Sequence, residues 1–109
     1  MQERSEFRIV YPLPARPIVT IGAHRFRALD ISEQALRLDQ RDVTRTLSVG
    51  ERVAGQICLA QQVEHPFEGQ VRRLDAQVAV VLLDDSFRIG LAVIYQEQRH
   101  LRAHYPDWR

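Results

Sequence analysis

Apolar residues along most of this chain recur at every second position, in short runs separated by polar or glycine-containing turns. The first two runs, 17–21 and 25–29, flank Gly22, and we expect them to form a hairpin. Further strands are predicted at 35–38, 52–60, 66–74 and 77–83. Six short strands separated by turns favour an all-β fold, either a small antiparallel barrel or a sandwich.

Two segments depart from simple alternation. The run 77–83 is apolar at successive positions, which is typical of a strand covered on both faces. Near the C-terminus, the period becomes helical, and Pro106 ends the pattern. We therefore predict a helix from about Gly90 to His104 that packs an apolar stripe on the barrel, and the stripe consists of Leu91, Ile94, Gln98, Leu101 and Tyr105.

The first fourteen residues are polar and then rich in proline. Pro12, Pro14 and Pro17 exclude a helix there and favour extended chain. We interpret 1–14 as a flexible arm and 15–109 as the domain to which it leads.

Length and composition indicate one globular domain. The 109 residues are 45% hydrophobic and 27% charged, which excludes a disordered or collagen-like chain. The longest apolar run is far too short to span a membrane, and no apolar segment near Met1 indicates a secretory signal. A single cysteine, Cys58, favours the reducing cytoplasm. The net charge of +1 argues against a general DNA- or RNA-binding protein.

Residues suited to catalysis do not form a recognisable set. His100 and His104 have the i, i+4 spacing of a helical zinc site, but residue 101 is Leu rather than the Glu of a zinc protease. Asp84 and Asp85 follow a predicted strand, as turn residues do. We therefore expect no enzyme, no metal site and no cofactor.

The cations are chemically uniform, because all 15 basic residues are arginine. Guanidinium groups suit phosphate, the Hoogsteen edge of guanine and stacking on flat rings. Two short motifs carry such chemistry: Arg4-x-x-x-Arg8 on the arm, and Asp30-x-Ser32 in the turn after the hairpin. Neither is specific alone, since Asp30 and Ser32 are also what a local Asx or Ser turn would use.

The order of the motifs is more specific. The arginine pair precedes the barrel, Asp30–Ala35 leads into an apolar strand, and 50–59 and 69–73 follow. This order resembles the PilZ domain family, bacterial receptors for the second messenger cyclic di-GMP, with the signatures RxxxR and (D/N)xSxxG. The resemblance extends from Glu3 to about Tyr105 and implies a six-stranded, Greek-key-like barrel of PilZ type.

The resemblance also implies roles for the motif residues. Arg4 and Arg8 would contact guanine or phosphate, and an extended arm would place them up to about 13 Å apart. Asp30 would accept hydrogen bonds from guanine N1–H and N2–H₂, with Ser32 supplementing it. Ala35 stands where the family has glycine, so either backbone strain or a methyl beside the ligand is expected there.

Other residues have weaker support. Arg72 and Arg73 are further candidate ligand contacts or solvated strand residues. Trp108 is a candidate stacking residue, but a mobile C-terminal tail is the favoured interpretation.

We expect a single-domain cyclic di-GMP receptor that clamps its arm on binding and acts in trans on an unidentified protein partner. The alternative is a PilZ-fold interaction module that does not bind cyclic di-GMP. A third possibility, an unrelated oligonucleotide-binding barrel, would need surface aromatic residues, whereas Phe26 and Phe67 alternate as core residues do.

Overall fold

Antiparallel strands and one long helix make up the chain. The computed structural model describes residues 8–41 and 45–108. The strands are β1 (Ile9–Val10), β2 (Ile18–Ile21), β3 (His24–Ile31), β4 (Ala35–Asp39), β5 (Arg52–Cys58), β6 (Glu64–Asp75) and β7 (Val78–Leu83). The helices are α1 (Leu91–His104) and the short 3₁₀ turns η1 (Leu13–Ala15), η2 (Ala60–Gln62) and η3 (Asp85–Phe87).

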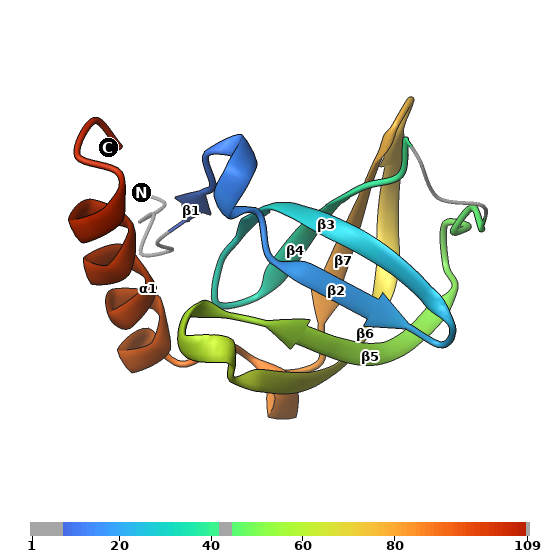
Figure 1. The fold of residues 1–109 in the computed structure, drawn as a ribbon. Coiled ribbons are helices and arrows are strands. Elements are labelled where there is room, and N and C mark those ends of the chain that lie inside the picture. Colours follow the sequence, from blue (N-terminus) through green and yellow to red (C-terminus); the bar gives the residue numbers. More distant parts are fainter. Residues whose placement is uncertain (1–7, 42–44, 109) are drawn as a thin grey trace, which may run out of the picture.

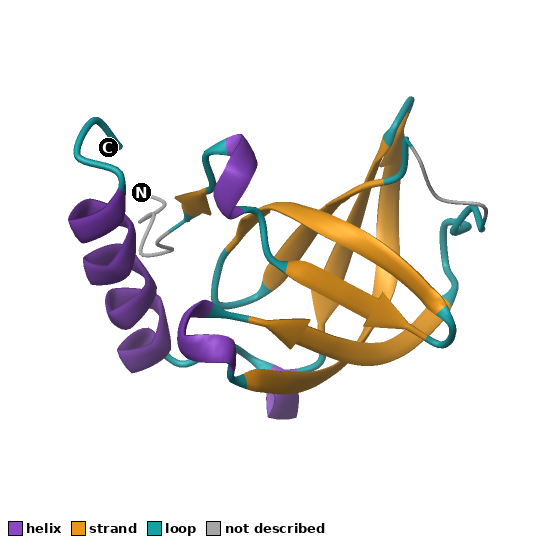
Figure 2. Cartoon of the chain, viewed as in Figure 1, coloured by secondary structure: helices purple, strands orange, loops and turns teal. Residues whose placement is uncertain are grey.

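Six of the strands close into a barrel. The hydrogen-bonded order is β1-β3-β2-β5-β6-β7-β4, and β3 also pairs with β4, which closes the ring from β2 to β7. Figure 2 shows the strands forming the barrel while α1 and the 3₁₀ turns lie around its ends. Gly22 adopts φ +62° in the β2–β3 turn, a conformation that glycine allows without strain. The predicted all-β barrel with its hairpin at Gly22 is confirmed, with β1 as an additional strand.

The barrel interior is filled by the alternate apolar residues that the pattern selected. Phe26 and Phe67 are 1% and 3% exposed, as expected for core residues. Two glycines permit neighbouring strands to approach closely. A Cβ at Gly55 would lie 1.9 Å from the Thr20 carbonyl oxygen, and one at Gly69 would lie 2.3 Å from that of Leu82.

The prediction that β7 is covered on both faces is wrong. Ala79 and Val81 point into the core and are fully buried. On the other face, Val80 and Leu82 are only half-buried, and they line an open cleft. The outer apolar residues of this run therefore line a cleft rather than packing under a second layer.

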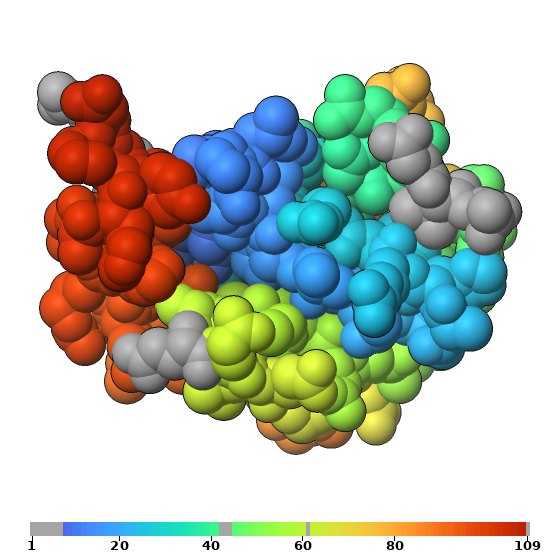
Figure 3. Space-filling model, in the orientation of Figure 1, coloured from blue at the N-terminus to red at the C-terminus, as the bar shows by residue number. Residues whose placement is uncertain are grey.

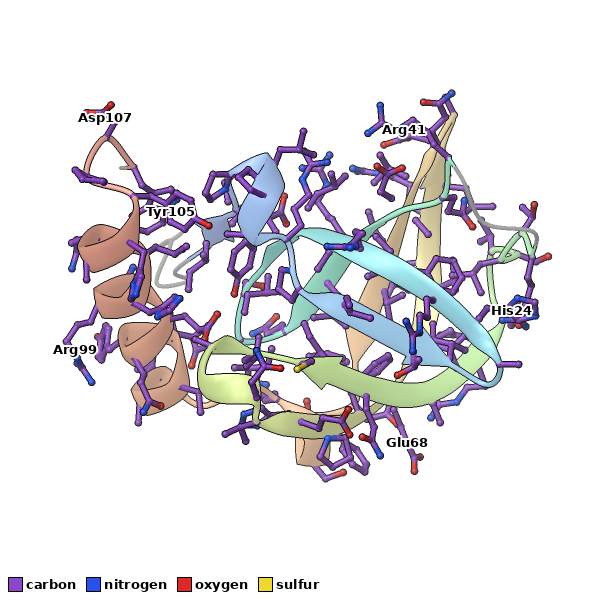
Figure 4. All side chains as sticks on the ribbon, viewed as in Figure 1. His24, Arg41, Glu68, Arg99, Tyr105 and Asp107 are labelled. Atoms are coloured by element: carbon purple, nitrogen blue, oxygen red, sulfur yellow. The ribbon has the colours of Figure 1, made fainter. Side chains whose placement is uncertain are left out.

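Helix α1 covers one end of the barrel, where it contacts the chain near β1 and η2 (Figures 1 and 3). The predicted helix is confirmed, but its buried stripe differs from the prediction. Leu91 is 38% exposed, whereas Glu97 is 4% exposed between Ile94 and Leu101. Figure 4 shows Tyr105 pointing toward the barrel and Arg99 pointing away from it. Among the described helices, none is long and apolar enough to cross a membrane.

Polar contacts tie α1 to Tyr11, the residue that directly follows β1, and to η2. The Tyr11 hydroxyl donates to Glu97 Oε1 at 2.5 Å, and the Ala60 backbone N–H donates to Glu97 Oε2 at 2.8 Å. Burial, followed by the negative charge of Glu97, raises the pKa of Tyr11. The structure thus places a charged group of α1 between β1 and η2 and satisfies both of its oxygens.

The segment assigned to the arm contributes part of the fold. In β1, Ile9 pairs with Ile31 and is fully buried. Trp108, expected either in a C-terminal tail or as a stacking residue, packs near β1 and does not line the cleft beside Val80 and Leu82. It is half-buried against the core, and its Nε1 donates to the Val10 carbonyl at 2.6 Å.

Candidate functional site

The candidate site lies on the outer face of β3, β4, β7 and β6. The strand registers place one residue from each strand in a single row across this face. Asp30 pairs with Arg37, Arg37 with Val80, and Val80 with Arg73. At about 4.8 Å between neighbouring strands, the backbone positions of this row span roughly 14 Å.

Two β-bulges aim the charged ends of the row outward. In β3, Phe26 and Ala28 face the core, so strict alternation would send Asp30 inward as well. The register shifts between Ala28 and Asp30, which places Asp30 opposite the outward-facing Arg37. The shift between Val71 and Arg73 in β6 has the same effect at Arg73.

Together these residues border a cleft of about 600 Å³. Its lining residues are Arg8, Asp30, Ser32, Ala35, Arg37, Arg72, Arg73, Val80 and Leu82. The centre is apolar, because Val80 and Leu82 present their side chains from β7. The remainder is strongly cationic, with four arginines and one aspartate. An anion with flat apolar surfaces fits this combination of charge and floor.

Asp30 is held in place by Arg37. Arg37 Nη1 lies 2.8 Å from Asp30 Oδ2, and the Asp30 residue is only 4% exposed. The Arg37 side chain is 35% exposed, so the guanidinium reaches the cleft from the partly open side. The ion pair compensates for the burial of the carboxylate and fixes the side chain of Asp30 in the cleft wall.

Ser32 shapes the β3–β4 turn. Its Oγ accepts hydrogen bonds from the backbone N–H groups of Ala35, at 3.2 Å, and Gln34, at 3.4 Å. The Ser32 N–H donates to the Ala35 carbonyl at 2.9 Å. Ser32 therefore fulfils the local turn role, and its hydroxyl proton remains available to a ligand because Oγ acts as the acceptor in these two contacts.

The backbone at Ala35 is not strained. Among the described non-glycine residues, only Gln62 has a positive φ, so Ala35 lies in ordinary strand conformation. Of the two consequences expected for the missing glycine, strain is excluded. What remains is one methyl group in the cleft lining, beside Leu82 on the next strand.

The other sequence-predicted residues are distributed as follows. Arg8, Arg72 and Arg73 all border the cleft, and Arg73 Nε also lies 3.5 Å from Asp75. Arg4 lies outside the described residues. Apart from Trp108, the structure thus brings every predicted ligand contact that it describes to the same cleft.

Sequence reasoning missed three residues of the cleft: Arg37, Val80 and Leu82. The signal for Arg37 was present, because it alternates with buried Leu36 and Leu38 and so must face outward. The apolar outer residues of β7 were noticed, but they were assigned to packing.

The remaining polar candidates lie elsewhere. Asp84 is bound by Arg52 through two hydrogen bonds of 3.0 and 2.6 Å, and this contact lowers the pKa of Asp84. The rings of His100 and His104 are 4.2 Å apart on α1. Within the described residues, no cluster of three potential metal ligands occurs.

Comparison with known proteins agrees with this geometry. The PilZ domain family matches residues 2–104, nearly the whole chain. A search of the curated proteins found no match. The matched span includes the barrel, both bulged strands and every residue of the cleft. The chain therefore belongs to the PilZ domain family.

Proposed function

We propose that this chain is a single-domain cyclic di-GMP receptor and that the cleft over β7 is its binding site. PilZ domains are binding or adaptor modules of the cyclic di-GMP type. The observation that supports binding here is the placement of Asp30 beside four arginines over an apolar floor. That arrangement offers an acceptor for guanine, cations for phosphate and a surface for stacking.

The chemistry of the ligand matches the cleft part by part. Cyclic di-GMP has two phosphates and two guanines, so it needs cations with directional donors as well as acceptors for N–H groups. Arg8, Arg72 and Arg73 supply such donors around the rim. Val80 and Leu82 supply a flat floor on which a base can lie, with arginine planes available to stack on its other face.

Binding is proposed to change the conformation of the N-terminal arm, including Arg4, and thereby the exposed surface. Arg8 directly precedes β1, and β1 contacts β3 through Val10 and Asp30. Closing the arm over the ligand would therefore alter the surface next to α1. A protein partner in the cytoplasm would respond to this change, so that the receptor acts in trans.

One observation favours a second candidate function. The methyl group of Ala35 occupies the cleft lining where the family motif has glycine. The alternative is therefore a PilZ-fold interaction module that does not bind cyclic di-GMP.

Calorimetric titration with cyclic di-GMP tests the proposal. We expect micromolar or tighter binding by the wild type and at least tenfold weaker binding by Arg8→Ala, because a charge-assisted contact contributes about 1.5–3 kcal/mol. Arg99→Ala is the matched control, since it removes the same charge from the outer side of α1. If no heat and no change in melting temperature occur at high ligand concentration, the receptor proposal is wrong and the alternative stands.

Hydrogen exchange tests the proposed change in the arm. Amide exchange in 1–8 is expected to slow when cyclic di-GMP is added. Equal exchange with and without bound ligand would refute the conformational step but not the binding.

A further inference from the structure

The pairing of Asp30 with Arg37 creates a specific pattern of hydrogen-bonding groups. A carboxylate offers acceptors only, and a guanidinium offers donors only. Arg37 Nη1 is 2.8 Å from Asp30 Oδ2, and both side chains line the cleft. The cleft wall therefore carries, side by side, two carboxylate oxygens and a guanidinium nitrogen.

This order of groups is the one that cytosine presents to guanine. Cytosine offers two acceptors and the N4 amino donor, which pair with N2–H₂, N1–H and the acceptor O6 of guanine. Adjacent acceptor and donor atoms must lie close together to meet N1–H and O6 at once. The contact between Asp30 and Arg37 satisfies that requirement before any ligand arrives.

We infer that Arg37 is a specificity-determining residue that donates to O6 of a guanine whose N1–H and N2–H₂ are bound by Asp30. This inference rests on the proposed function, and it adds to the family motif a residue that the motif does not contain. The ion pair persists on binding, because a guanidinium has five N–H donors and the contact with Asp30 Oδ2 uses one nitrogen of the three. Arg37 Nε is also buried and has no hydrogen-bond partner among the residues that the structure describes, so this guanidinium is not saturated there.

Adenine is rejected at the same position. It carries an amino donor where guanine has O6, and it has an acceptor where guanine has N1–H. Arg37 would then face a donor and Asp30 an acceptor, so both contacts would become unfavourable. A ligand group that leaves buried polar atoms unpaired loses far more affinity than one that merely lacks a contact.

Two other roles for Arg37 make different predictions. A purely structural ion pair would only hold Asp30 in place, so its loss would weaken the contacts of Asp30 with N1–H and N2–H₂ and lower the ratio of cyclic di-GMP to cyclic di-IMP affinity. A contact to phosphate would affect all cyclic dinucleotides equally, because every one of them carries the same phosphates. Only a contact to O6 lowers the preference for guanine over adenine while leaving the ratio of cyclic di-GMP to cyclic di-IMP unchanged, because those two ligands share O6.

The experiment measures binding of cyclic di-GMP, cyclic di-IMP and cyclic di-AMP by calorimetry. Cyclic di-IMP keeps O6 and N1–H but lacks the N2 amino group, so it separates the contact at Asp30 from that at Arg37. The variants are Arg37→Met, which removes every donor, and Arg37→Gln, which keeps an amide donor without the charge. Arg52→Gln is the matched control, because it breaks an Arg–Asp pair away from the cleft.

In Arg37→Met, the preference for cyclic di-GMP over cyclic di-AMP is expected to fall by roughly 5- to 150-fold. The ratio of cyclic di-GMP to cyclic di-IMP is expected to remain that of the wild type. Arg37→Gln should retain part of the guanine preference, and it serves as the test if Arg37→Met does not fold.

Other results overturn the inference in distinguishable ways. Equal weakening of all three ligands in both variants would show that Arg37 acts through charge alone, while the receptor function would stand. If the wild-type protein binds cyclic di-GMP and cyclic di-AMP equally well, the inference about Arg37 is also wrong, while the receptor function stands. A wild-type protein that binds none of the three would refute the proposed function itself.

Discussion

Replacing Tyr11 by Phe would remove a single hydroxyl group from the contact that ties α1 to β1. The Tyr11 hydroxyl lies 2.5 Å from Glu97 Oε1, and both residues are 4% exposed. After the substitution, the buried carboxylate would keep one partner in this contact, the backbone N–H of Ala60. The rest of the ring would still fill its place in the core, so packing is preserved.

The expected loss of stability follows from the charge of Glu97. A hydrogen bond to a charged group contributes about 1.5–3 kcal/mol, and leaving one oxygen of a buried carboxylate unsatisfied adds to that cost. We expect Tyr11→Phe to lower the free energy of unfolding by about 2–3 kcal/mol, against a total of roughly 5–15 kcal/mol for a domain. The melting temperature should fall by roughly 10–20 °C.

Urea denaturation followed by circular dichroism measures this loss. Tyr95→Phe is the matched control, because it deletes the same hydroxyl from a tyrosine of α1 that is 41% exposed. A surface substitution of this kind is expected to change stability by no more than about 0.5 kcal/mol.

The pH dependence gives an independent check. Burial raises the pKa of Tyr11 above its ordinary value of 10.0 in the folded state. The unfolded chain therefore loses this proton first, and the stabilisation is complete below pH 10 and declines as the pH rises further. The decline is about 1.4 kcal/mol per pH unit for one group. Tyr11→Phe lacks this component, so the difference in stability between wild type and variant should shrink as the pH rises above about 10.

A difference below about 0.5 kcal/mol at neutral pH would refute the reasoning, because it would mean that water replaces the lost hydroxyl at Glu97. The result also bears on function. Tyr11 follows β1, and Val10 of β1 pairs with Asp30. Weaker anchoring of β1 is therefore expected to raise the dissociation constant for cyclic di-GMP, and calorimetry on the folded variant measures it.

Further substitutions test the cleft and its frame. Ala35→Gly is expected to lower stability by about 0.5–1 kcal/mol, since Ala35 is unstrained, and to change ligand affinity by no more than about fourfold, the contribution of one methyl group. Gain of binding from none would instead support the ligand-free interaction module. Gly69→Ala should lower stability by about 1–3 kcal/mol in a urea titration, because its Cβ would lie 2.3 Å from the Leu82 carbonyl oxygen. Unchanged stability would mean that β6 and β7 separate without cost. Arg52→Gln should return the pKa of Asp84 toward its ordinary value in an NMR titration, because Arg52 is the main cause of the lowered pKa. An unchanged titration would contradict that assignment.

The patterning of the chain was sufficient for most of the architecture. Short runs of apolar residues identified the six barrel strands but not β1, and the change to helical spacing identified α1. The prediction of the buried face of α1 failed at Glu97, a charged residue that is nevertheless buried. Glu97 lies in the middle of the helical stripe, but only its partners Tyr11 and Ala60, far away in the chain, make the burial of its charge acceptable.

The sequence predicted the site residues that lie close together in the chain. It did not predict those that other strands bring to the site. Asp30 lies near the end of β3 and Ser32 stands two positions later, in the turn that follows, so their proximity is a property of the sequence alone. Arg37 and Val80 meet Asp30 only through strand register, and register is a tertiary property. The bulges matter most, because without them alternation would turn Asp30 and Arg73 into the core.

The amino-acid sequence was enough to predict an antiparallel barrel with a terminal helix and to identify the arginine and aspartate motifs of a PilZ domain. It could do so because alternation and short motifs are local properties of a chain. The tertiary structure was needed to show which charged side chains face the same cleft and that Arg37 pairs with Asp30 there. The reason is that hydrogen-bond register and bulges are set by the pairing of distant strands, which no local pattern encodes.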